Sequence, residues 1–478
     1  MQERPVKKNQ LLELVITDMA FGGVGIGKIQ TEKGDFAVFV QNAIPGQRVL
    51  ARVDKSQKRF AECKLVEVLQ PSPDEVAIPY QAIPGAPYAT LPMELQRSYK
   101  RRTTLELFKR IGKIDDVESL LDEYIASPAD WHYRNKMEYA FSVIRFDLND
   151  KNEYDDFGLG FKHRGTWWCV ENLDNDSGLF DEAFEKALKE IRRWCEGTGL
   201  PAWHPPKHIG FFRYLVVRKS FASDQLLVNL VTSEKGVDDF NSHAFVAFMR
   251  ELLGERLAGV IHTINPNTGD RIDPLSGRTI QLWGATHVTE TIHGLKFNIS
   301  MTSFFQTNPR SAEKLYAKVL DYAGVEEGND GTYIMDLFCG TGTITQLLAK
   351  RSQRKIIGVD IVADAIDDAR RSAAANGVTN LEFFAADVGK FLLEYPQYQS
   401  HISCIVLDPP RGGIAPKTLR KVITLNAPRI VYVSCNPSTQ ARDTIDLMEA
   451  GYRLVKMSLV DQFPHTSHVE TVALFERM

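Results

Sequence analysis

The stretch TYIMDLFCGTGTITQLLAK, residues 332–350, places an apolar run, a glycine-bearing loop and a helical pattern in direct succession. The apolar run is typical of a buried strand, and Gly340 and Gly342 let the backbone approach a ligand closely. The loop matches neither the dinucleotide fingerprint nor the P-loop. The stretch therefore predicts a strand, loop and helix of an α/β sheet with a ligand site that is not built for a pyrophosphate.

The same rhythm of strand, loop and helix repeats towards the C-terminus. It runs through KIIGVDIVADAIDDARRSAAANG (355–377), LEFFAADV (381–388), CIVLDPPRGG (404–413) and RIVYVSCNPSTQARDTIDLMEAGY (429–452). Short Val- and Ile-rich runs that alternate with helices predict a parallel, doubly wound sheet. Ligands of such sheets bind at the carboxyl ends of the strands, where all the motifs discussed below fall.

Two further regions precede this sheet. Residues 12–70 alternate apolar and polar positions between Gly and Pro turns, which predicts a small closed β-barrel, and the five prolines of residues 71–88 predict a linker. Helical and β-rich stretches between about 90 and 300 predict an α+β domain with an antiparallel sheet. We therefore expect domains at residues 1–73, 74–300 and 301–478.

Charge and composition limit the partners and the compartment. The chain has 478 residues and a formal net charge of −4, so any nucleic acid must be held by local basic runs such as 54–59, 97–102 and 162–164. It has six cysteines without a C-x-x-C pair, which argues against disulfides and zinc. With no secretory signal and no apolar run long enough for a membrane, the expected location is the cytoplasm. Separately, we expect the protein to be a monomer.

Two acidic residues end the strands that follow the glycine loop. Asp360 is placed to accept hydrogen bonds from ribose hydroxyls, and Asp387 from an adenine amino group. Each one alone would more often be a helix cap or a turn former. A glycine loop followed by acids at two successive strand ends resembles the S-adenosylmethionine-binding half of Rossmann-like methyltransferases, so the expected ligand is a methyl donor.

The next strand ends in LDPPRGG, residues 407–413, which bears on what is methylated. Methyltransferases of exocyclic amines carry an aromatic residue after this D-P-P, whereas this chain carries Arg411. The motif also lacks the cysteine of the RNA cytosine type. Both acceptors are therefore disfavoured, and Asp408 and Arg411 are placed to orient the polar edge of another base.

Cys435 follows the fifth strand, in VYVSCNPSTQARD, residues 431–443. A free cysteine is more often buried and inert than reactive. Three features favour a nucleophile here: the strand-end position, the Asn-Pro turn after it, and the methyl-donor site on the same sheet. Cys339 is the competing thiol, but it would lie beside the donor and not beside the acceptor base.

A thiol at this place suits methylation of carbon 5 of uracil. Addition of a thiolate at carbon 6 makes carbon 5 nucleophilic, so the site must lower the thiol pKa or remove the proton during attack. The proton on carbon 5 must then leave to a general base. Glu470, close in sequence to His465 and His468, is the candidate, although without Cys435 it would read as a surface glutamate at a strand edge.

In this order, DLFCGTGT, LDPPRGG, VSCNPSTQARD and FPHTSHVE resemble the RNA uridine-5-methyltransferase family. MTSFFQTNPRSAEKLY, residues 301–316, resembles the family's segment leading into the catalytic domain, and residues 12–73 resemble its TRAM domain, an OB-like RNA-binding barrel. The resemblance implies a Rossmann-like methyltransferase domain behind a TRAM barrel and a central α+β domain. It also implies a target uridine flipped out of a hairpin loop or bulge.

Site residues carry over motif by motif. The resemblance gives Cys435 as nucleophile and Glu470 as general base, and Phe304 as the residue that splays the flipped nucleotide. Around S-adenosylmethionine or the target base it places Gln306, Phe338, Thr343, Asp360, Asp387 and Asp408.

The sequence departs from the family at one point. Many members hold an iron–sulfur cluster through four cysteines, three of them shortly before the helix that reads LQRSYKRR here, but residues 78–96 contain none. Cys63 and Cys169 are isolated and do not restore a set of four. We expect no cluster and no other metal, and a brace made by packing of Tyr80, Tyr88 and the prolines.

The same residues allow alternative targets and functions. Ribosomal RNA, specifically 23S, is favoured over transfer RNA because the TRAM barrel accompanies that branch of the family. A methyltransferase of the same fold acting on another atom, such as one of cytosine, is a further alternative. A catalytically silent RNA-binding or RNA-folding protein would show a decayed cofactor loop or a lost nucleophile, and this sequence shows neither.

Overall fold

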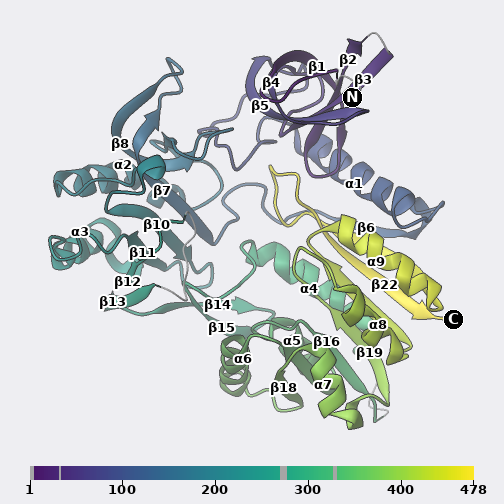
Figure 1. Ribbon diagram of the computed structural model, residues 1–478. Coiled ribbons are helices and arrows are strands. Elements are labelled where there is room, and N and C mark those ends of the chain that lie inside the picture. Colours follow the sequence, from purple (N-terminus) through teal and green to yellow (C-terminus); the bar gives the residue numbers. More distant parts are fainter. Residues whose placement is uncertain (1–4, 32–33, 270–276, 327–330) are drawn as a thin grey trace.

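The computed structural model describes residues 5–31, 34–269, 277–326 and 331–478. A small barrel lies at the top of the molecule, a central sheet with its helices lies to the left, and a larger sheet with helices on both faces lies at the lower right (Figure 1). Within the described residues, no helix is long and apolar enough to cross a membrane.

The N-terminal strands close into a barrel in the order β1-β2-β3-β5-β4. Alternate strand residues point inward, and Val38, Val40, Val49 and Val53 are fully buried. This confirms the closed barrel expected from the alternating pattern. The strands are β1 (Leu11–Ala20), β2 (Val24–Thr31), β3 (Gly34–Gln41), β4 (Arg48–Ser56) and β5 (Phe60–Gln70).

The central sheet has the order β13-β12-β11-β10-β7-β8-β9, and its neighbours are antiparallel except for the parallel β11–β12 pair. Its helices bury an apolar face, including Phe184 and Phe245, against the sheet. This confirms an α+β region. The elements are β7 (Lys136–Phe146), β8 (Glu153–Lys162), β9 (Val170–Asn172), α2 (Glu182–Gly197), β10 (Phe212–Lys219), β11 (Leu226–Thr232), α3 (Ser242–Leu253), β12 (Leu257–Ile264) and β13 (Arg278–Gly284).

The C-terminal sheet has the order β18-β17-β16-β19-β20-β22-β21-β6. The strands from β18 to β20 are parallel, and β22 enters antiparallel between β20 and β21. Its strands are β6 (Leu121–Ile125), β16 (Tyr333–Leu337), β17 (Lys355–Asp360), β18 (Leu381–Ala385), β19 (Ile402–Leu407), β20 (Arg429–Ser434), β21 (Tyr452–Val460) and β22 (Glu470–Arg477).

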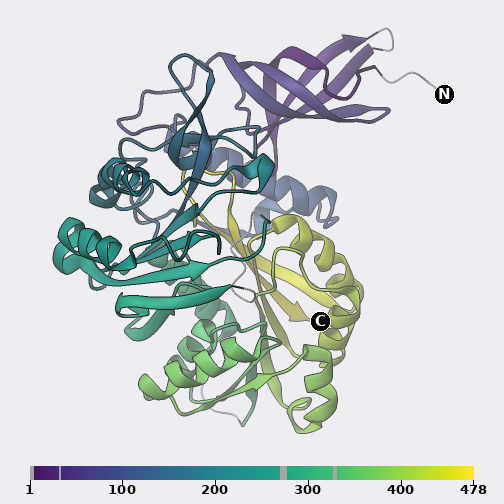
Figure 2. The same cartoon turned by 60° about the vertical axis from the view of Figure 1, so that its left-hand side comes forward.

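Alternate residues of these strands face two helical layers, which is why the strands read as continuous apolar runs. Ile334 packs with α4 and α5 on one face, and Met335 packs with α1, α7, α8 and α9 on the other. Figure 2 shows both layers from a second direction. The helices are α1 (Met93–Arg110), α4 (Pro309–Ala323), α5 (Thr343–Arg351), α6 (Ala363–Ala375), α7 (Val388–Glu394), α8 (Pro416–Thr424) and α9 (Pro437–Glu449).

The C-terminal sheet also recruits residues from far upstream. Strand β6 pairs in parallel with β21, and α1 packs against α9, although both lie within the predicted central domain of residues 74–300. A separate hairpin of β14 (His287–Ile292) and β15 (Leu295–Ser300) packs on the α4 side. The chain thus passes between the two sheets more than once, and the boundaries 1–73, 74–300 and 301–478 stay a prediction.

Candidate active site

The loop between β16 and α5 has the geometry of a ligand cradle. Phe338 takes a left-handed φ of 70°, which is rare for a bulky residue and typical of functional sites. Gly342 has a φ of 74° and caps α5, and a Cβ there would lie 2.6 Å from the Phe383 ring. A Cβ on Gly340 would meet nothing within 4 Å, so the loop borders open space at that point.

Carboxylates surround this loop. Asp360 accepts hydrogen bonds from the backbone N–H groups of Gly340 and Val362, both at 2.9 Å. Asp336 accepts a 2.6 Å hydrogen bond from Thr345 Oγ1 through Oδ2, whereas its buried Oδ1 has no partner within the described residues. Burial raises the pKa of Asp336 to about 7. An unused acceptor and several acids suit a cationic ligand with hydrogen-bond donors, as S-adenosylmethionine is.

The other predicted cofactor residues lie at the same edge of the sheet. Thr343 is the first residue of α5 and is buried. Asp387 follows β18 and caps α7, because its side chain accepts from Lys390 N at 3.2 Å. Asp387 therefore has the ordinary capping role that was its alternative reading, and only Oδ1 is engaged in it.

Cys435 and Glu470 lie side by side where β20 ends and β22 begins. Ser434 of β20 pairs with Thr471 of β22, so Cys435 and Glu470 occupy the next position of this antiparallel register. Cys435 is partly exposed, and Glu470 is only 4% exposed. The chain turns after the thiol because Asn436 caps α9 and Pro437 begins it.

The charges at this pair do not favour a free thiolate. Burial, together with the charges of Glu470 and Asp408 and against that of Arg411, raises the pKa of Cys435 to about 11. Burial also raises the pKa of Glu470 to about 8, with Asp408 adding to it, and that of Asp408, which keeps a partly exposed edge, to about 7. Of the two sequence expectations, a lowered thiol pKa is wrong for the free protein. The other expectation, removal of the thiol proton while Cys435 attacks the base, still stands as a prediction.

The residues expected to meet the base are accessible. Phe304, in the loop before α4, is 75% exposed. Arg411 is also exposed, and its backbone carbonyl accepts a 3.0 Å hydrogen bond from Asn436 Nδ2, which ties the D-P-P loop to the cysteine turn. Gln306 Oε1 accepts a 3.4 Å hydrogen bond from Gln462 Nε2.

Sequence reasoning missed two polar residues at this edge. Asp336 is the first letter of DLFCGTGT, and its place at a strand end was an available signal. Gln462 meets Gln306 across 156 residues of chain, and it also donates to the carbonyl of Asn308 at 3.0 Å. A contact between segments so far apart has no local sequence signal.

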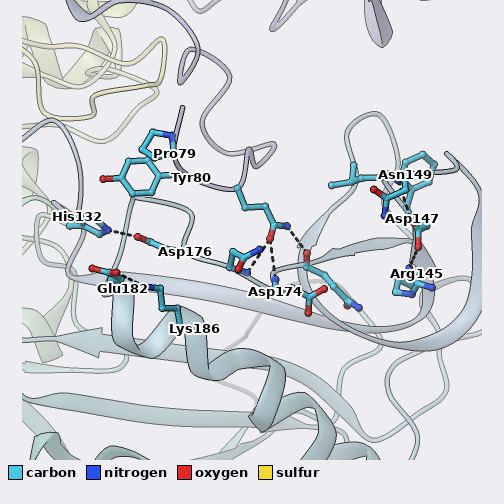
Figure 3. Close-up of a pocket in the computed structure, with 15 residues that line it drawn as sticks. Pro79, Tyr80, His132, Arg145, Asp147, Asn149, Asp174, Asp176, Glu182 and Lys186 are labelled. Atoms are coloured by element: carbon cyan, nitrogen blue, oxygen red, sulfur yellow. Dashed lines mark hydrogen bonds and ion pairs between the residues drawn. The ribbon is translucent and has the colours of Figure 1, made fainter. Parts of the chain in front are cut away.

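One set of possible metal ligands lies in the central region, within the described residues. Across the described ranges all the cysteines are free thiols, and the His, Asp and Glu side chains close enough to share an ion are His132, Asp176 and Glu182. They line a cavity of about 860 Å³, in which His132 Nε2 lies 2.8 Å from Asp176 Oδ2 and Glu182 pairs with Lys186 (Figure 3). These contacts account for the group as a hydrogen bond and an ion pair within the protein.

The fold and the site together define a class. A glycine loop after β16, acids at the ends of β17 and β18, and a D-P-P motif after β19 mark the chain as an S-adenosylmethionine-dependent methyltransferase.

Comparisons with known proteins give the family. Residues 286–478 match the model of the tRNA (uracil-5-)-methyltransferase family, and residues 5–66 match the TRAM domain. An uncharacterized RNA methyltransferase of Clostridium acetobutylicum is 36% identical over 99% of both chains, and one of Chlorobaculum tepidum is 35% identical over 100% of this chain and 98% of its own. The chain belongs to the family of RNA uracil-5-methyltransferases.

A solved structure matches almost the whole chain. The crystal structure of Pyrococcus abyssi tRNA (uracil-54, C5)-methyltransferase in complex with S-adenosyl-L-homocysteine is 26% identical, with a TM-score of 0.69. The match covers 97% of this chain and 100% of the Pyrococcus chain. The likeness therefore includes the barrel and the central region as well as the catalytic sheet.

Proposed function

We propose that this protein methylates carbon 5 of a specific uridine in structured RNA through a covalent adduct of Cys435. The observation that carries the proposal is the juxtaposition of Cys435, just after β20, and Glu470, the first residue of β22. Both lie at the edge of the sheet that also bears the glycine loop. A nucleophile and a base in adjoining positions are what addition to carbon 6 and removal of the carbon 5 proton require.

The proposed reaction begins at the thiol. Cys435 Sγ bonds to carbon 6 while its proton passes to the carboxylate of Asp408, because the thiol does not ionise beforehand and Glu470 must stay free to act as base. Carbon 5 then takes the methyl group from the positively charged sulfur of the donor; the sulfur–methyl bond breaks, and its electron pair leaves with the donor as a neutral thioether. Glu470 removes the proton from carbon 5, the carbon–sulfur bond at carbon 6 breaks, and the double bond returns. The thiolate regains its proton from the carboxylate that took it.

The remaining predicted residues bind the two substrates. Gln306, Phe338, Gly340, Gly342, Thr343, Asp360 and Asp387 surround the methyl donor, with Asp408 between donor and base. Phe304 and Arg411 hold the RNA. The exposure of the Phe304 ring supports this role, because a flipped base stacks on aromatic side chains.

The proposed target is a uridine of 23S ribosomal RNA, modified in the cytoplasm by a monomer. The presence of the TRAM barrel beside the catalytic sheet supports the proposal that the target is a large structured RNA. Transfer RNA is the second candidate, favoured by the full-length match to the Pyrococcus abyssi tRNA enzyme. The intact loop and thiol argue against a silent RNA-binding protein.

The target is tested by mapping 5-methyluridine in ribosomal and transfer RNA from cells with and without the gene. Loss of one modified uridine in 23S RNA, restored by the parent protein and not by Cys435→Ala, is the expected result. A loss confined to transfer RNA would overturn the ribosomal assignment and keep the chemistry. No change in either RNA would contradict both.

A further inference from the structure

The segment of residues 461–469, which joins β21 to β22 and delivers Glu470, is irregular and mostly buried. Asp461, Gln462, His465 and Val469 are at most 1% exposed. Loops usually lie on the surface because their backbone polar groups need partners. A buried loop next to the predicted general base must therefore be held by specific contacts.

His465 is held from α1 and from the stretch before it. Its backbone N–H donates to Gln96 Oε1 at 2.9 Å, and its carbonyl accepts from Tyr88 N at 3.0 Å. Gln96 Nε2 lies 3.1 Å from His465 Nδ1 and also donates to the carbonyls of Tyr88 and Leu91, at 2.9 and 2.8 Å. The fully buried Gln96 thus holds the backbone of His465 and lies against its ring.

The imidazole of His465 stacks on Trp131, with ring centroids 3.6 Å apart and planes at 21°. Tyr80 packs on Trp131 with centroids 4.5 Å apart. Burial, aided by the charge of Lys100, lowers the pKa of His465 to about 4, so the ring is neutral and stacks as an apolar group. His465 has a left-handed φ of 65°, a backbone conformation that such contacts must maintain.

The neighbours of His465 are anchored in the same way. Tyr133 donates its hydroxyl to the carbonyl of Pro464 at 2.9 Å, and Lys100 Nζ donates to the carbonyl of Phe463 at 2.9 Å. Three consecutive carbonyls, of residues 463–465, therefore accept from residues 88–133, which lie outside β20 and β22.

We infer that Gln96, Trp131 and His465 form a bracket that positions Glu470 for removal of the carbon 5 proton. The inference rests on the proposed role of Glu470. The bracket touches neither Cys435 nor the glycine loop in any described contact, so its residues are positioning residues. Its loss should displace the base while leaving the nucleophile and the methyl-donor site in place.

The distinguishing readout is the step that slows. With Trp131→Ala, attack of Cys435 and methyl transfer should keep their rates, whereas release of methylated RNA should slow by roughly 10- to 100-fold, since a small misplacement of a catalytic group has that cost. The denaturation-resistant RNA–protein adduct should accumulate on ordinary uridine RNA. Trp131→Phe should recover most of the release rate, because it restores a stacked ring.

Two variants keep the test sharp. Trp194→Phe is the matched control, since Trp194 stacks on Phe248 between α2 and α3 and should leave release unchanged. Gln96→Met, which keeps the side-chain length without its hydrogen bonds, serves if Trp131→Ala does not fold. Equal slowing of adduct formation and release would make the bracket a general structural support and overturn the inference. No adduct with the parent protein on 5-fluorouridine RNA would instead contradict the proposed function.

Discussion

Cys435 and Glu470 extend the antiparallel register of β20 and β22 by one position beyond the Ser434–Thr471 pair. Adjacent strands lie about 4.7–4.9 Å apart, so the backbones of the two residues are neighbours even though 34 residues separate them in the chain. Insertion of β22 between β20 and β21 is the topological feature that makes this possible.

Replacement of Glu470 by Gln should stabilise the protein increasingly as pH rises. Burial raises the pKa of Glu470 to about 8, whereas an unfolded glutamate has a value of about 4.3. Between these values the folded state binds more protons than the unfolded one, so the native carboxyl costs stability as pH increases. The melting temperature of Glu470→Gln minus that of the parent should therefore grow between pH 5 and 8. A constant difference would contradict the raised pKa.

Asp360→Asn should weaken the methyl-donor site without unfolding the chain. The carboxylate accepts from Gly340 N and Val362 N, and it is the predicted partner of the ribose. Hydrogen bonds to charged groups contribute about 1.5–3 kcal/mol, so the Kd for S-adenosylhomocysteine should rise by roughly 10- to 100-fold. Titration calorimetry measures it. The exposed Asp368→Asn on α6 is the control, and an unchanged Kd for Asp360→Asn would remove Asp360 from the site.

Phe304→Ala should lower the activity of the enzyme on RNA and leave the affinity of the methyl-donor site unchanged. Its ring is 75% exposed, so truncation leaves no core cavity. Loss of stacking on a flipped base costs about 1–3 kcal/mol, which should lower kcat/KM for RNA by roughly 5- to 150-fold. Binding of S-adenosylhomocysteine should stay the same, and Phe304→Tyr should retain activity. A parallel loss of donor binding would argue against a base-stacking role.

Lys100→Met should strongly destabilise the protein. Lys100 Nζ and Asp461 Oδ1 lie 2.7 Å apart, and both side chains are at most 1% exposed. Removing one partner of a buried pair costs about 3–5 kcal/mol, and without Lys100 the buried Asp461 carboxylate keeps the longer contact of its Oδ2 to Arg97 Nε, at 3.9 Å. Chemical denaturation should show this loss, and the double change Lys100→Met with Asp461→Leu should recover most of it. Full additivity of the two single changes would mean that the pair does not interact.

Local patterns predicted most of the fold and the loop geometry. Alternation in residues 12–70 gave the barrel, and DLFCGTGT indicated the strand, the turn and the helix start, because turn chemistry and strand burial are local properties. The partly exposed LDEYI of β6 carries no comparable signal, and its pairing with β21 spans more than 330 residues. Long-range pairing is decided by packing that no short window contains.

In the site, too, local sequence patterns indicated some features, whereas others depend on long-range contacts. Cys435, Glu470 and Asp360 could be proposed from sequence because Cys435 and Asp360 stand at the end of an apolar run and Glu470 stands at the start of one. The raised thiol pKa was not predicted, because it depends on burial of the thiol and on two carboxyl groups, Glu470 and Asp408, that only the folded sheet brings close. The contacts that hold His465 likewise join residues 369 positions apart. Tyr80 and Tyr88, expected as a packing brace, do lie next to Trp131 and His465.

The most direct test of the account uses RNA carrying 5-fluorouridine at the target position. Fluorine cannot leave carbon 5 as a proton does, so the methylated adduct on Cys435 cannot resolve and should appear as protein plus RNA by mass spectrometry. We expect this adduct with the parent protein and with Cys339→Ala, and none with Cys435→Ala. An adduct of equal yield with Cys435→Ala would contradict it.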